Sequence, residues 1–246
     1  MQDVHVPSVS ARSWGVLMAA SVFGANLGDY VAGHLALGFI GRMLVLAAVL
    51  VSVFLGERRD RSKSHAWYWM AVVVIQAVST KLADFSTVDL GFSRATVIAG
   101  LALLLVVTFV AARSSPSLII STHMISRPGT AAKPMADAAH WMAMLVASTL
   151  GSVAADFFSI GLGFGALGAA IVLSVMTAGV FCLPRLSNAN RLLIYWMTIA
   201  LILAAGSALA DVVARDLAVG LTLSTALTGA LMVGLLLLWR EPQRRS

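Results

Sequence analysis

The chain has 246 residues, of which 59% are hydrophobic and only 11% are charged, and its mean hydropathy is +0.91. Soluble globular domains are about 45–50% apolar and about 25% charged, so this composition excludes an ordinary soluble domain and predicts an integral membrane protein. The single cysteine, Cys182, excludes an internal disulfide and a cysteine-rich metal site.

Apolar segments along the chain predict eight helices that cross a membrane. About 20 apolar residues span a hydrocarbon core of ~30 Å. Segments of this kind occur, in chain order, at residues 14–34, 39–55, 66–86, 94–112, 139–160, 163–183, 191–213 and 218–239. Short connections alternate with longer polar ones, which pairs the spans into four helical hairpins. We therefore expect an all-α polytopic membrane protein.

The basic residues indicate how these spans are oriented. With eight spans, both termini and the three longer loops lie on one side, and that side carries most of the 17 lysines and arginines. Because Lys and Arg are retained on the cytoplasmic face, we expect both termini in the cytoplasm. The net charge of +6 then reflects topology, and nucleic acid is not expected as a partner.

An internal repeat organises the chain. Every odd-numbered span has an aspartate in its far half, a tryptophan 15 residues before it and a small residue five before it. The aspartates are Asp29, Asp84, Asp156 and Asp211, the tryptophans are Trp14, Trp69, Trp141 and Trp196, and the small residues are Gly24, Ser79, Gly151 and Gly206. The first span shares this pattern, so we expect it to be retained rather than cleaved as a signal peptide.

The two halves of the chain are offset by 127 residues, the distance from Trp14 to Trp141. This predicts a first half at residues 1–112, a cytoplasmic linker at 113–138 and a second half at 139–246. Each unit has two spans, so all four units insert in the same direction, as parallel repeats about an axis along the membrane normal. We expect the tryptophans at the cytoplasmic interface and the aspartates about 22 Å away, towards the outer leaflet.

The four aspartates are the predicted functional site, because ionisable side chains inside a membrane are costly and by default mark function. Polar residues on the same helical faces extend it, and Lys81 supplies an internal counter-ion or proton-coupling partner. The predicted ion-binding set is Asp29, Asp84, Asp156, Asp211, Asn26, Lys81, Thr80, Ser152 and Ser207, with the four aspartates as candidate metal ligands. We expect odd-numbered spans inside the bundle and even-numbered spans against lipid.

The chemistry of this set predicts transport. Oxygen-rich, sulfur-poor surroundings suit hard cations or protons, and carboxylates held close together cannot all stay ionised. We therefore expect proton-coupled efflux of a small cation, divalent metals among the candidates, with lipid and the cation or proton as partners. Neither a cofactor nor an enzymatic activity is predicted. The alternative is a non-transporting scaffold, or a subunit that binds lipid or a partner protein, in which the aspartates only hydrogen-bond neighbouring helices.

The repeat also resembles a known family. Two-helix units that carry small-x-x-x-(Gly/Ala)-Asp, together with the segment at residues 121–127, are similar to the bacterial "uncharacterised membrane-anchored protein" repeat family over residues 7–239. The resemblance implies an integral protein of the bacterial inner membrane built of repeated hairpins, without a securely assigned activity. Where that family often has Gly-Glu-Thr before an aspartate, this chain has Gly24-Ala25-Asn26.

Overall fold

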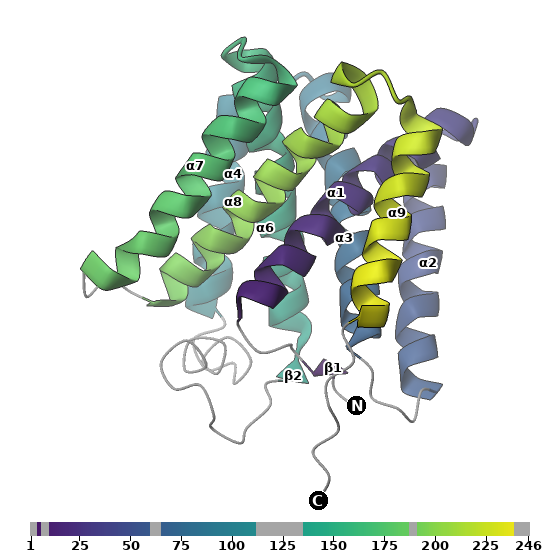
Figure 1. Cartoon of the computed structure of the whole chain (residues 1–246), viewed down its shortest axis with the longest axis horizontal. Helices are drawn as coiled ribbons and strands as arrows, with labels where there is room; N and C mark the ends of the chain where they lie inside the picture. Colours follow the sequence, from purple (N-terminus) through teal and green to yellow (C-terminus); the bar gives the residue numbers. More distant parts are fainter. Residues whose placement is uncertain (1–3, 6–9, 60–64, 112–134, 187–190, 239–246) are drawn as a thin grey trace, which may run out of the picture.

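The computed structural model describes residues 4–5, 10–59, 65–111, 135–186 and 191–238. Eight α-helices run through these parts of the chain (Figure 1). They are α1 (Ala11–His34), α2 (Phe39–Arg59), α3 (Ala66–Asp84), α4 (Arg94–Ala111), α6 (Ala138–Asp156), α7 (Gly165–Leu186), α8 (Arg191–Asp211) and α9 (Leu221–Leu238). Most of the predicted linker, including residues 121–127, lies outside the described residues.

Each helix falls where a membrane span was predicted. Seven are long and apolar enough to cross a membrane, and α4 is apolar but shorter, over Arg94–Val110. Two strands of two residues each, β1 (Val4–His5) and β2 (Met135–Ala136), pair antiparallel below the helices in Figure 1. The prediction of a helical chain, with most of its helices long and apolar enough to cross a membrane, is confirmed.

Four helices form an inner ring. α1 packs against α3, α3 against α6, α6 against α8, and α8 against α1. In the central part of each inner helix 50–61% of the residues are buried, compared with 11–28% in α2, α7 and α9. The prediction that odd-numbered spans lie inside the bundle is therefore confirmed.

Each outer helix packs on the inner helix that comes next along the chain. α2 lies on α3, α4 on α6 and α7 on α8, while α9 returns to α1; Figure 1 shows α7 beside α8 and α9 beside α1. The two helices of a predicted hairpin are thus joined by a short connection without being each other's main neighbours. Each outer helix links two inner helices, which ties the bundle together.

Small residues allow the inner helices to approach closely. A Cβ atom on Gly24 would lie 2.6 Å from the Val73 carbonyl oxygen of α3, and one on Gly151 would lie 2.9 Å from the Ala200 carbonyl oxygen of α8. A Cβ atom on Gly206 would lie against the Ser21 side chain of α1. The small residue of the predicted repeat is therefore a packing feature, as small-xxx-small contacts are in other membrane helices.

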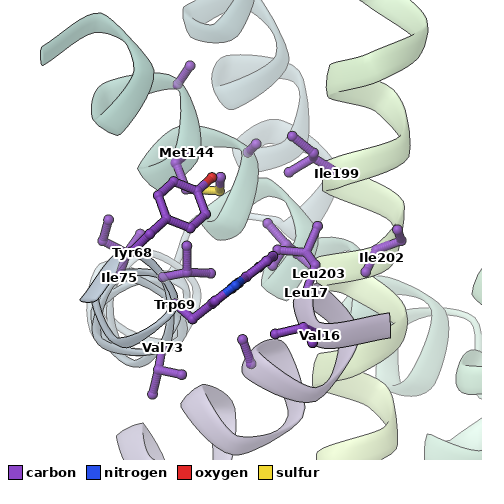
Figure 2. Packing of buried hydrophobic residues seen from close by; sticks show 14 of the residues in the cluster. Val16, Leu17, Tyr68, Trp69, Val73, Ile75, Met144, Ile199, Ile202 and Leu203 are labelled. Atoms are coloured by element: carbon purple, nitrogen blue, oxygen red, sulfur yellow. The ribbon is translucent and has the colours of Figure 1, made fainter. Parts of the chain in front are cut away.

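An aromatic and aliphatic core fills the part of the ring where the inner helices begin. Figure 2 shows the Tyr68 ring next to Met144 and the Trp69 indole directed towards Leu17, all in one cluster of buried residues. Trp69 and Trp196 are only 3% and 0% exposed. Their helices turn these two large apolar indoles into the core of the bundle, and their predicted depth at the membrane interface stays a prediction.

Candidate functional site

The four aspartates line one small cavity at the carboxyl-terminal part of the inner helices. Its volume is about 40 Å³. A single water needs ~10–15 Å³, so the cavity can hold a few waters or a small cation. The residues around it are Asp29, Asp84, Asp156, Asp211, Thr80, Ser152, Ser207 and Arg215, with Ala25, Ala83 and Ala155 between them. The four aspartates and the three predicted hydroxyl residues are thus brought together.

The backbone changes directly after three of these aspartates. Asp84, Asp156 and Asp211 each end an α-helix that continues as a π-helical turn. The turns are η1 (Phe85–Asp89), η2 (Phe157–Gly161) and η3 (Val212–Asp216). Gly91, Gly163 and Gly220 follow the three turns with φ angles of 69°, 73° and 80°, a left-handed conformation that favours glycine. π-helical turns are frequent at functional sites.

Lys81 connects two of the carboxylates. Its side chain is only 8% exposed, and its Nζ atom donates to Asp29 Oδ1 at 2.6 Å and also to Asp84. The pair with Asp84 follows from the predicted spacing on one helix. The pair with Asp29 joins α3 to α1, so Asp29, which has no cationic neighbour on its own helix, receives one from another helix.

Arg215 lies at the rim of the cavity. Its Nη1 atom is 3.3 Å from Asp211 Oδ1, the predicted pairing, and its Nη2 atom is 3.5 Å from Asp29 Oδ2. The arginine side chain is 65% exposed. Exposed ion pairs contribute about 0–1 kcal/mol, so Arg215 is held far more loosely than Lys81.

Asp156 differs from the other three aspartates. Among the described residues, no hydrogen bond or ion pair to its carboxylate was found. Arg94 and Arg215 act on Asp156 only through longer-range electrostatics. A partly buried carboxylate that faces a cavity without a partner is a candidate ligand for a cation.

The negative charges around the cavity outnumber the positive ones. With all groups ionised, the four aspartates outnumber Lys81 and Arg215 by two charges. Within the parts of the chain that the structure describes, no group of three or more His, Cys, Asp or Glu is arranged to hold a metal ion, and the Lys81 ammonium lies between Asp29 and Asp84 instead.

A buried hydrogen-bond network continues from the cavity into the bundle. Gln76 is fully buried, and its Nε2 atom donates to Ser207 Oγ at 2.8 Å and to Ser152 Oγ at 3.3 Å. Its Oε1 atom accepts a hydrogen bond from Ser148. Gln76 lies eight residues before Asp84 on the predicted polar face, yet it was not in the predicted ion-binding set.

Asn26, a member of the predicted ion-binding set, contacts α9 and not the aspartate cavity. Its side-chain Nδ2 atom donates to Ser224 Oγ at 2.7 Å and to Thr228 Oγ1 at 3.4 Å, both on α9. Asn26 is not among the residues that line the cavity. It ties α9 to α1 and is not brought together with the aspartates.

Comparison with known proteins gives one match. Residues 139–189 and 194–245 each match the model of a family described as a "Repeat of Unknown Function (DUF347)". The chain is similar to this family over those two segments, which begin 55 residues apart, the same spacing as Asp156 and Asp211. This agrees with a repeat in the second half of the chain. No curated protein and no solved structure matches the chain.

Proposed function

We propose that the protein is a proton-coupled transporter of a small cation in a bacterial inner membrane. The observation that carries the proposal is that one aspartate from each of four inner helices lines the same cavity. In this scheme Asp29, Asp84, Asp156 and Asp211 form the cation site. Efflux is the proposed direction of transport. The distribution of basic residues favours a location of both termini in the cytoplasm.

Lys81 acts in this scheme as a built-in substitute for the cation. When the site is empty, its ammonium neutralises Asp29 and Asp84. An incoming cation is attracted first by Asp156, which has no partner among the described residues. The cation then competes with the ammonium for the two paired carboxylates. Because close carboxylates cannot all stay ionised, protons and the cation exchange at the same groups.

The arrangement of the helices supports a further part of the proposal, namely that the whole chain consists of four copies of one two-helix unit. The ring order α1, α3, α6, α8 follows the order of the predicted repeats. The small residue five positions before each aspartate contacts the next inner helix, as Gly24 and Gly151 do. Ser79 does so by donating a hydrogen bond to the Leu145 carbonyl oxygen. These features favour units related by rotation about the membrane normal.

Cation flux in proteoliposomes tests the proposal. Mn²⁺, Mg²⁺, Ca²⁺, Na⁺ and K⁺ are first screened for a shift in the melting temperature of the purified protein. The cation that shifts it is then followed by flux, with an internal pH dye reporting protons. Asp156→Asn removes a charge-assisted interaction worth about 1.5–3 kcal/mol, so we expect flux to fall by about tenfold or more. Asp216→Asn, an exposed aspartate on η3, is the matched control and should keep full flux.

The alternative is a non-transporting scaffold. It is favoured by the ion pair between Lys81 and Asp29, which joins α3 to α1. It predicts that no cation shifts the melting temperature, and that Asp29→Asn and Asp156→Asn act only by lowering stability. Unchanged flux in a folded Asp156→Asn variant, or a wild-type protein that responds to none of these cations, would reject the transport proposal in favour of this alternative.

A further inference from the structure

A second polar cluster lies at the opposite end of the inner helices. His140 is fully buried, and its Nε2 atom is hydrogen-bonded to the Tyr68 hydroxyl at 3.2 Å. His140 precedes Asp156 by 16 residues on the same helix, which places it about 24 Å from the aspartate layer. The structure buries this histidine between α3, α6 and α8.

The other ring nitrogen of His140 has no partner. In the described part of the chain, Nδ1 is buried and makes no hydrogen bond. The rings of Trp141 and Trp196 pack at centroid distances of 5.5 Å and 5.6 Å from the imidazole. Buried polar atoms are nearly always hydrogen-bonded, so an unpartnered one calls for a functional explanation.

An apolar layer separates this cluster from the polar half of the bundle. It contains one buried residue from each inner helix, 12 positions before the aspartate of that helix: Leu17, Val72, Met144 and Ile199. Figure 2 shows Leu17, Met144 and Ile199 around the rings of Tyr68 and Trp69. The Gln76 network lies on one side of the layer, and the buried imidazole lies on the other. Protons therefore cannot pass between them in this conformation.

We propose, on the basis of the proposed function, that His140 is the proton-exchange group at the inner end of the transporter. When the inner half opens to water, a carboxyl group of the site gives up its proton and becomes a carboxylate. In the tautomer with hydrogen on Nε2, the imidazole donates to the Tyr68 hydroxyl and has a free lone pair on Nδ1. Nδ1 takes this proton through intervening water, forming an N–H bond. The imidazolium then loses the proton to water on the inner side and returns to its neutral form.

The surroundings of His140 suit a transient carrier. His140 lies in the first turn of α6, where the helix dipole disfavours a positive charge, and burial disfavours it further. Three titratable groups surround it: Tyr68 on α3, Tyr195 on α8, and Asp137, whose side chain caps α6. Tyr195 lies close enough to Tyr68 for the two to interact electrostatically. In the closed conformation the ring therefore stays neutral, and it accepts a proton only when water enters.

The experiment compares wild type, His140→Gln and His140→Phe in proteoliposomes that contain a pH dye. The probe is whichever of Mn²⁺, Mg²⁺, Ca²⁺, Na⁺ and K⁺ shifts the wild-type melting temperature. A positioned proton carrier contributes about 10²–10⁴ to a rate, so we expect the proton movement coupled to cation flux to slow by about tenfold or more. The cation-dependent melting shift should remain unchanged, because the cavity is intact. His34→Gln, at an exposed histidine near the other end, should keep wild-type coupling.

Two variants are used because one of them could misfold. His140→Phe preserves the aromatic packing against Trp141 and Trp196, which His140→Gln does not. Wild-type coupling in either folded variant would overturn the role of His140. Loss of both the cation-dependent melting shift and the proton coupling would also overturn it, because His140 would then be a structural residue. A wild-type protein without any cation response rejects the transport proposal itself, which is a distinguishable result.

Discussion

The two ends of the inner ring are built from the same four helices but differ in charge and in packing. At one end, carboxylates and hydroxyls surround a cavity of about 40 Å³, and three of the helices loosen into π-helical turns. At the other end, Tyr68, Trp69 and Trp196 are buried in a continuous core. Carboxylates are thus concentrated around the cavity, and the other end is a close-packed core that contains the hydrogen bond between Tyr68 and His140.

A second contrast lies within the cavity itself. Asp29 and Asp84 share the ammonium of a nearly buried lysine, whereas Asp156 has no partner among the described residues. Paired carboxylates hold helices together, and an unpaired one is available to a ligand. The four aspartates are equivalent in the predicted repeat, but their contacts in the structure differ.

The largest expected effect on stability comes from removing Lys81. Lys81→Met leaves Asp29 and Asp84 close together without their cation, and breaking one side of a buried pair costs on the order of 3 kcal/mol. We expect a marked fall of the melting temperature in detergent. Lys81→Arg should lose much less, because it keeps the charge, and Lys81→Met combined with Asp29→Asn should recover part of the loss. A Lys81→Met protein as stable as wild type would show that the ion pairs do not hold α1 to α3.

A smaller effect is expected where the helices cross. A methyl group on Gly24 would lie 2.6 Å from a backbone oxygen of α3, so Gly24→Ala should destabilise the protein by about 1–3 kcal/mol. The matched control is Gly100→Ala on α4, where nothing lies within 4 Å of an added Cβ; it should be neutral or stabilise by up to ~1 kcal/mol. Equal melting temperatures for the two variants would contradict the close crossing of α1 and α3.

Much of this organisation could be predicted from the sequence. Hydropathy located the helices, and the recurrence of aspartate at a constant distance from tryptophan identified the residues that share the cavity. Contacts that depend on how one helix is rotated against another could not be predicted. In helices that are apolar on nearly every side, the pattern does not say which face meets which neighbour. The bond from Lys81 to Asp29, the direction of Asn26 towards α9 and the burial of Trp69 all depend on that rotation.

The smallest effect on stability is expected for Asp156→Asn. Because no contact of this carboxylate with the described residues is lost, the free energy of unfolding should change by no more than about 0.5 kcal/mol. Thermal unfolding in detergent, without added cation, measures this directly. A large loss of stability would mean that Asp156 is a structural residue like Asp29, and the contrast within the cavity would disappear.

Proton release on cation binding tests the central claim most directly. Purified protein in weakly buffered detergent solution is titrated with the cation that shifts its melting temperature, while a pH indicator counts the protons set free. If the aspartates exchange protons for a cation, wild-type protein should acidify the solution in proportion to the cation bound, and Asp156→Asn should release fewer protons with weaker binding. Cation binding without proton release, or equal release from the two proteins, would contradict the proposed exchange at this site.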